Sequence, residues 1–120
     1  IKMKTNNVIQ DKTFKFAERI VNLYKHLIVK EKEYVLSKQV LRSGTSIGAN
    51  IEEAIGGTSK RDFQNKLSTA YKEARETRYW LKLLYSAKFV NVKIFDSFIN
   101  DIDEICRILG TIIKTLKLRN

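Results

Sequence analysis

The sequence predicts an all-α protein, an antiparallel up-down-up-down four-helix bundle that forms a single domain over residues 1–120. Its 120 residues include no proline and only five glycines, so little interrupts regular structure. Four segments carry apolar residues at steps of three and four, which is the spacing of an amphipathic helix. The connectors between these segments are short, and short connectors place consecutive helices antiparallel to one another.

The first helix is expected near residues 13–29, because residues 1–11 are polar, lack helical spacing and are expected to be frayed. His26 has no second histidine, cysteine or carboxylate one helical turn away, so we interpret it as a surface or flanking residue rather than a ligand or base. The apolar stripe of this helix consists of Phe16, Ala17, Ile20, Tyr24, Leu27 and Ile28.

A charged connector, Lys30–Glu33, leads to a second helix expected near residues 34–55. Gly44 and Gly48 lie one turn apart inside it, and each glycine costs about 1 kcal/mol relative to alanine. Such a pair is explained if another backbone approaches this small-residue face closely. The same spacing occurs in membrane-helix dimers, but the charged flanks of this helix argue against a membrane. The inner stripe consists of Leu36, Val40, Ser43, Gly44, Ile47, Ile51, Ala54 and Ile55.

The turn at residues 56–59 ends the second helix and begins the third. A glycine is expected to adopt the left-handed conformation that commonly follows a helix end, and Ser59 is expected to cap the third helix, with Asp62 three residues later. A phosphate-binding loop would need a preceding strand and a following Gly-Lys-Ser/Thr, and the sequence has neither.

The third helix, expected near residues 60–87, has a seven-residue repeat of apolar residues that is typical of helix bundles. Tyr71, Arg78 and Tyr85 recur beside this seam, and Trp80 lies on its other flank. These flanking residues need a second surface to cover them, either the neighbouring helix or another subunit, and the sequence leaves both open. The seam consists of Phe63, Leu67, Ala70, Ala74, Thr77, Leu81 and Leu84.

The fourth helix is expected near residues 91–117, with Asn91 as its cap. Acidic residues occupy its first half and basic residues its second, which complements the helix dipole and marks a solvated outer face. Its apolar side consists of Phe95, Phe98, Ile99, Ile102, Ile105, Cys106, Leu109, Ile112, Ile113 and Leu116. The core is expected to include Leu67, Ala74, Leu81, Ile102 and Leu109.

The charge balance is strongly basic, with 23 Lys and Arg against 13 Asp and Glu and a formal net charge of +10. The surplus divides evenly between the two halves of the chain, so there is no segregated basic tail. Such a distribution either keeps a protein soluble or marks a surface for a polyanion such as RNA or DNA.

The single cysteine, Cys106, excludes an internal disulfide and lies among isoleucines and leucines, so it is expected to be a small buried residue in a reducing compartment. No apolar stretch approaches the length of a membrane span, and no hydrophobic region follows the first lysines. We therefore expect a cytoplasmic protein that is neither secreted nor membrane-bound.

One stretch of the second helix, Gln39–Ala54 (QVLRSGTSIGANIEEA), carries a family resemblance together with Ser59–Phe63 and Lys72–Thr77. These segments closely resemble the four-helix bundle family encoded in intervening sequences of bacterial 23S ribosomal RNA genes. The resemblance implies a homopentamer of four-helix bundles with a basic surface. It also implies kinship with the accessory variability protein of diversity-generating retroelements, which works with a reverse transcriptase and binds nucleic acid.

The motif residues form either a binding site or a polar clasp that fixes helix register or a subunit contact. Buried polar networks commonly specify geometry, which favours the clasp. The segment Glu52–Ala54 departs from the Ala-Glu-Gly of many family members, so the end of the second helix is expected to continue differently here. By the resemblance, the motif positions are Arg42, Ser46, Asn50, Glu53, Lys72, Glu73 and Glu76.

No catalytic residue, cofactor or metal site is predicted. A ferritin-like di-metal centre needs two Glu-x-x-His pairs, and the chain has a single histidine. Catalysis by paired carboxylates needs a cleft, which a closed bundle does not obviously supply.

The leading functional expectation is a non-enzymatic homo-oligomer, with a pentamer favoured, that binds RNA or DNA electrostatically. The alternative is a structural adaptor that binds a protein partner such as a reverse transcriptase, with no direct role in nucleic-acid binding. The candidate contacts with nucleic acid are outward-facing residues of the third and fourth helices, namely Lys66, Arg75, Lys82, Lys114 and Lys117.

Overall fold

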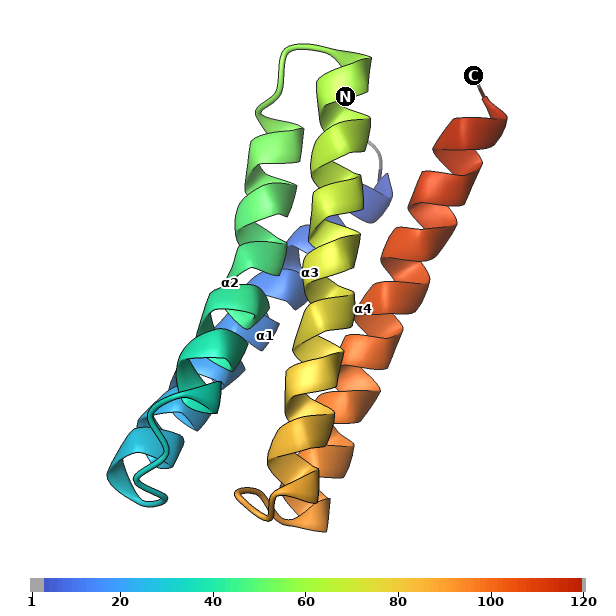
Figure 1. Ribbon diagram of the computed structural model, residues 1–120. Helices are drawn as coiled ribbons and strands as arrows, with labels where there is room; N and C mark the ends of the chain where they lie inside the picture. The colour runs from blue at the N-terminus through green and yellow to red at the C-terminus, as the bar shows by residue number, and fades with distance from the viewer. Residues whose placement is uncertain (1–3, 120) are drawn as a thin grey trace.

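The structure, a computed structural model, describes residues 4–119 as four consecutive antiparallel helices without a strand in that range (Figure 1). The expected all-α four-helix bundle is confirmed, and the last three helices begin and end within two residues of their expected bounds. The helices are α1 (Lys4–Val29), α2 (Leu36–Ile55), α3 (Lys60–Ser86) and α4 (Val92–Leu118).

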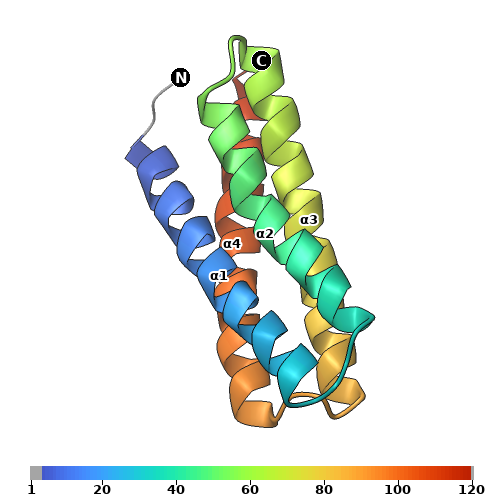
Figure 2. The ribbon, with the colours of Figure 1, turned by 90° about the vertical axis from the view of Figure 1, so that its left-hand side faces the viewer.

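The bundle is an elongated body of 46 × 21 × 19 Å. The α1–α2 and α3–α4 connections lie at one end, and the α2–α3 connection lies at the other end together with both termini (Figures 1 and 2). Packing is heaviest between α2 and α3 and lightest between α1 and α4.

The start of α1 corrects one expectation. Of the segment 1–11 that was expected to be frayed, residues 4–11 are helical, and residues 1–3 lie outside the described part of the chain. Ile9 and Thr13 are buried and extend the stripe of Phe16 by two turns. The polar Thr13 hid this extension in the sequence. Its hydroxyl is satisfied within the helix, because it donates to the carbonyl of Ile9 at 2.8 Å.

The core lies along the axis between all four helices and includes every residue expected there. Leu67, Ala74, Leu81, Ile102 and Leu109 are each no more than 2% exposed. Their burial removes a continuous apolar seam from water, which is the main favourable term in the folding of such a bundle.

The small-residue face of α2 packs against α1 of the same chain. A Cβ atom at Gly44 would lie 2.8 Å from the Cγ1 atom of Ile20, and one at Gly48 would lie 3.4 Å from the carbonyl oxygen of Thr13. The expected close approach of another backbone is therefore present at Gly48, where the backbone comes from α1, whereas at Gly44 the close neighbour is the side chain of Ile20. This face is not available to a second subunit.

The helix ends agree with the sequence at two caps and differ at one. The Oγ atom of Ser59 accepts from the backbone N–H of Asp62 at 3.0 Å, and the Oδ1 atom of Asn91 accepts from that of Ile94 at 2.8 Å. The expected left-handed glycine is wrong, because Gly56 has a φ of −81° and no glycine of the described residues has a positive φ. At Gly57 space is tight, since a Cβ atom would lie 3.2 Å from the backbone carbonyl oxygen of Ala54 and would also displace the carboxylate of Asp62.

The start of α2 depends on Glu33, which precedes the helix. Its carboxylate accepts hydrogen bonds from the backbone N–H groups of Val35, Leu36 and Ser37 at 3.2, 3.0 and 2.7 Å. Burial acts to raise the pKa of Glu33, but these hydrogen bonds outweigh it and leave the pKa below its usual value. A carboxylate thus satisfies the free N–H groups that a serine or asparagine would usually cap.

Candidate functional site

A groove on the outer side of α3 and α4 combines an apolar floor with a basic rim. Its volume is about 410 Å³, and no acidic side chain lines it. We call it the α3–α4 groove, and it is lined by Ser68, Tyr71, Lys72, Gly110, Ile113, Lys114 and Lys117.

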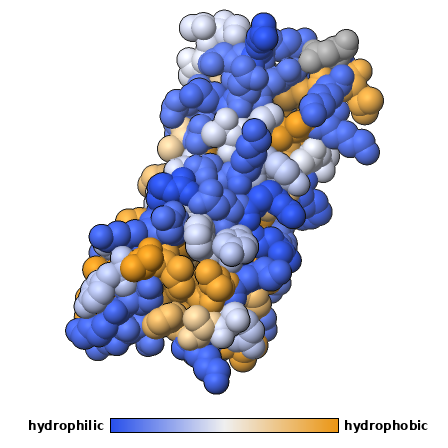
Figure 3. Space-filling view, in the orientation of Figure 1, coloured by the Kyte–Doolittle hydropathy of each residue, from blue (hydrophilic) through white to orange (hydrophobic). Residues whose placement is uncertain are grey.

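The floor of the groove is apolar because Tyr71 of α3 and Ile113 of α4 line it. Tyr71 lies beside the α3 seam, next to Gly110, where a Cβ atom would be 3.6 Å from its ring carbon Cε1. This distance is an ordinary van der Waals contact, so the ring of Tyr71 lies beside the backbone of α4 at Gly110. Ile113, one turn further along α4, is partly buried and packs against the core. Figure 3 shows apolar surface near the C-terminal end of α4, bordered by hydrophilic residues.

The rim of the groove is basic and unneutralised. Lys72, Lys114 and Lys117 are exposed, and so is Arg75, one turn after Tyr71. Among the side chains that the structure describes, none of these four cations makes an ion pair. The end of α4 adds to the positive charge of this face, because residues 105–119 contain four basic residues and no acidic one. Positive potential therefore accumulates at this end of the α3–α4 face.

Four of the five expected nucleic-acid contacts lie on this face. Lys114 and Lys117 line the groove itself. Arg75 and Lys82 follow Ser68 at steps of seven residues, which places them on the same side of α3. Lys66 lies elsewhere, because it turns toward α2 and its Nζ atom is 2.8 Å from the Oε1 atom of Glu53. This hydrogen bond raises the pKa of Lys66.

Three of the seven motif residues form a polar clasp between α2 and α3, namely Arg42, Glu73 and Glu76. The Nη1 atom of Arg42 lies 3.0 Å from the Oε2 atom of Glu73, and its other terminal nitrogen pairs with Glu76. Trp80 donates its indole N–H to Glu76 at 2.9 Å. The hydrogen bond from Trp80 lowers the pKa of Glu76, and Arg42 lowers it further.

The other motif residues do not join this clasp. The Oγ atom of Ser46 donates to the carbonyl of Arg42 at 2.6 Å, and the side-chain amide of Asn50 donates to the carbonyl of Ser46 at 2.8 Å. Both bonds stay within α2. Glu53 pairs with Lys66, and Lys72 lines the α3–α4 groove. The seven motif residues therefore divide between several local contacts.

A buried polar contact between α2 and α3 was not identified from the sequence. The hydroxyls of Ser43 and Thr77, both completely buried, hydrogen-bond to each other at 2.9 Å. Both positions appear in the apolar stripes of their helices. The sequence contained a signal for this contact, because a polar residue occupies a core position in each of the two neighbouring helices.

The flanking stripe of α3 packs against the neighbouring helix and is partly covered by it. Tyr71 lies at Gly110, Arg78 places its Nε atom 2.7 Å from the Oδ1 atom of Asp103, and Tyr85 stacks on Phe95 with ring centroids 4.4 Å apart. All these contacts are with α4, so the neighbouring helix covers part of this stripe, and Tyr85 remains 39% exposed.

A second apolar surface lies where α2 begins and α3 ends, at the lower end of Figure 3. Val35 is 70% exposed and Tyr79 is 59% exposed, and the ring of Trp80 packs edge-on against that of Tyr79. We call this surface the α2–α3 patch, and its residues are Val35, Leu36, Tyr79, Trp80 and Leu83.

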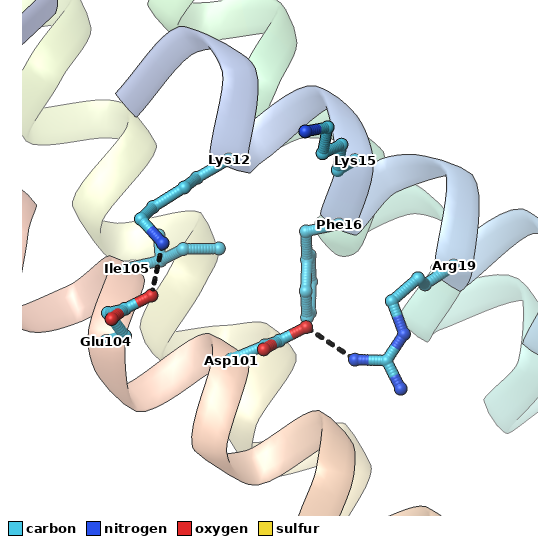
Figure 4. A pocket seen from close by; sticks show the side chains of 7 residues that line it. All are labelled: Lys12, Lys15, Phe16, Arg19, Asp101, Glu104 and Ile105. Atoms are coloured by element: carbon cyan, nitrogen blue, oxygen red, sulfur yellow. Dashed lines mark hydrogen bonds and ion pairs between the residues drawn. The ribbon is translucent and has the colours of Figure 1, made fainter. Parts of the chain in front are cut away.

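A smaller hollow of about 170 Å³ lies between α1 and α4, above Phe16 and Ile105 (Figure 4). Lys12 pairs with Glu104 at 2.6 Å, and Arg19 pairs with Asp101. The hydrogen bond from Lys12 lowers the pKa of Glu104. Because its two bridging cations are already neutralised, this hollow serves as a contact between α1 and α4 and is a poor site for an anion.

The described residues, 4–119, show neither a metal cluster nor a membrane span. No three His, Cys, Asp or Glu side chains among them come together to hold a metal ion. His26 lies at the end of α1, with its Nε2 atom 3.6 Å from a carboxylate oxygen of Glu31. Burial raises the pKa of the Cys106 thiol, which opposes a role as nucleophile. None of the helices in this range is both long and apolar enough to cross a membrane.

Comparison with known proteins confirms the family resemblance. The family described as 23S rRNA-intervening sequence protein matches residues 5–111. A crystal structure of a protein with unknown function from the S23 ribosomal protein family, from Bacteroides thetaiotaomicron VPI-5482, is similar with a TM-score of 0.89 and 54% sequence identity. The alignment covers 91% of this chain and 97% of that one. None of the curated proteins matches. Because the family match spans most of the 120 residues, the chain belongs to the family of 23S rRNA-intervening sequence proteins.

Proposed function

We propose that this protein is a non-enzymatic, cytoplasmic nucleic-acid-binding protein that contacts the phosphates of RNA or DNA through its α3–α4 face. The observation that carries the proposal is the set of unpaired cations around the α3–α4 groove. Single cations elsewhere, such as Lys25 and Lys38, also make no ion pair among the described side chains, but the groove gathers three such cations around one hollow that no acidic side chain lines. The cations of the groove are free to pair with an external anion.

The binding is expected to be electrostatic and to discriminate little between sequences. Each phosphate contact releases a bound counterion, so affinity falls with salt at a logarithmic slope of about 0.7 per contact for a single strand and about 0.9 for duplex DNA. Contacts with phosphates position a protein but do not read bases. A clear dependence on salt with weak sequence preference is therefore the expected signature.

The test is to titrate labelled RNA and DNA at several salt concentrations and to compare two double variants of equal charge. Lys114→Gln with Lys117→Gln removes two cations from the groove. Lys25→Gln with Lys38→Gln removes two exposed cations from α1 and α2. We expect the first variant to weaken binding strongly and to reduce the salt slope by about 1 to 2, and the second to change both much less.

Equal losses in the two variants would assign the binding to net charge and not to the groove. No binding at low salt would overturn the proposal and favour the adaptor alternative, in which a protein such as a reverse transcriptase is the partner.

The α2–α3 patch supports self-association as a second element of the proposal. Exposed aromatic and aliphatic side chains gathered in one region commonly mark a protein contact. We propose that this patch is buried between copies of the chain, and the family resemblance makes a homopentamer the favoured stoichiometry. Light scattering tests this. Tyr79→Glu is expected to lower the measured mass, and a wild-type monomer at tens of micromolar would overturn the proposed self-association.

A further inference from the structure

The apolar floor of the α3–α4 groove is not explained by binding to phosphates alone. Phosphates need cations and hydrogen-bond donors, which the rim supplies. Tyr71 and Ile113 add a partly exposed aromatic ring and an aliphatic side chain between those cations. A ligand that fits both features carries negative charge along its length and flat apolar groups beside it.

A second hollow extends the groove along α3. This hollow, of about 150 Å³, shares Ser68, Ile113 and Lys117 with the groove and extends to Asn65. The α3 residues that line the two hollows, 64–72, span about 12 Å at the rise of an α-helix. The exposed amide of Asn65 and the hydroxyl of Ser68 place hydrogen-bonding groups along the extended groove. A short extended strand fits such a site better than a compact anion does.

We infer that the α3–α4 groove binds a single-stranded segment of nucleic acid, with one base stacked on Tyr71 and the adjacent phosphates held by Lys72, Lys114 and Lys117. This inference rests on the proposed function and names the form of nucleic acid that the site takes. A single strand offers free base faces, whereas the bases of a duplex already stack on one another. Stacking on an aromatic ring tolerates any base, which agrees with the weak sequence preference expected of the protein.

The experiment compares Tyr71→Leu with wild type on three probes, which are an oligouridylate, an oligothymidylate of equal length and an RNA hairpin duplex. Tyr71→Leu keeps an apolar side chain but removes the ring. We expect it to weaken binding to both single strands by about 5- to 150-fold, as the loss of one stacked base implies. Its salt slope should stay at the wild-type value, because the phosphate contacts remain. Binding to the duplex should change little.

Two further variants control for folding and for general loss of aromatic surface. Tyr71→Phe retains the ring and is expected to bind single strands as wild type does. Tyr34→Leu removes an exposed tyrosine of the α1–α2 connection, at the opposite end of the bundle from the groove, and is expected to leave the affinity unchanged. Thermal unfolding verifies that each variant is folded at the temperature of the assay.

The outcomes separate this inference from the proposed function. If Tyr71→Leu binds single strands normally while the Lys114→Gln, Lys117→Gln variant binds them weakly, the electrostatic function stands and the stacking inference is overturned. An equal loss on the duplex also overturns it. A third outcome is that wild type binds no nucleic acid but binds an acidic amphipathic peptide in a manner that depends on Tyr71. This result would overturn both the proposed nucleic-acid-binding function and the stacking inference, and the groove would be a peptide site. The two single-stranded probes show whether the strand is RNA, DNA or either.

Discussion

Gly44 determines how closely α1 and α2 approach each other. Replacing it with alanine places a methyl group 2.8 and 2.9 Å from two side-chain carbons of the fully buried Ile20. Overpacking of this kind typically costs about 1–3 kcal/mol. The intrinsic preference of helices for alanine, about 1 kcal/mol, offsets part of that cost. We expect Gly44→Ala to lower the free energy of unfolding, measured by urea denaturation.

Gly110→Ala is the matched control, because it is also a change inside a helix. The added carbon would lie 3.6 Å from Tyr71, an ordinary contact. Here the helix preference acts without a clash, so we expect a gain of up to about 1 kcal/mol. If both variants gained stability, close approach would not be the reason for glycine at position 44.

At the scale of an element, the beginning of α2 is expected to depend on pH through Glu33. The pKa of Glu33 is lower in the folded protein than in the unfolded chain. Its contribution to stability is therefore fully present above the unfolded pKa and is lost as the pH falls through the folded pKa. We expect Glu33→Ala to cost about 1 kcal/mol at neutral pH, as removal of a helix cap does.

Glu33→Gln tests the role of the charge. We expect this variant to show a smaller loss of stability than wild type between neutral pH and the acid range, followed by urea denaturation at each pH. Glu18→Gln, at an exposed position of α1, is expected to retain the wild-type dependence. A wild-type pH profile in Glu33→Gln would show that the ionised carboxylate does not stabilise the start of α2.

The α2–α3 interface holds two kinds of polar contact that should differ in strength. Thr77→Val removes the buried hydroxyl that bonds to Ser43 and leaves Ser43 without this partner, a loss of about 1–3 kcal/mol. Arg42→Gln removes the polar clasp, whose arginine side chain is 48% exposed, and exposed ion pairs contribute at most about 1 kcal/mol each. Thr69→Val, at an exposed position of α3, controls for the threonine change itself. We expect thermal denaturation to rank Thr77→Val as the most destabilised, and a larger loss in Arg42→Gln would contradict this.

At the scale of the whole molecule, the repeating parts of the bundle were predictable from the sequence. The α3 seam repeats every seven residues from Phe63 to Leu84, and each of its members is buried. Helical periodicity alone identifies such positions. It failed at the start of α1, where Thr13 occupies a core position and bonds to its own helix.

The candidate site was less predictable because it depends on contacts between helices. Lys72 was assigned to the motif by resemblance, yet it shares the groove with Lys114, more than 40 positions away in the sequence. Whether a surface lysine is neutralised depends on which acidic side chain folds back beside it, as Glu53 does beside Lys66. Periodicity assigns a residue to a face of its helix, but it does not identify its neighbours on other helices.

The uneven packing of the four helices has a consequence for the speed of folding. Packing is extensive between helices that follow one another in the sequence and sparse between α1 and α4, the pair furthest apart. Low average sequence separation between contacting residues is associated with folding in microseconds to milliseconds. The α1–α4 contact closes the longest loop and contributes least, so we expect it to form after the rate-limiting step. Substitutions at Lys12 and Glu104 should then accelerate unfolding in stopped-flow measurements while leaving the folding rate nearly unchanged.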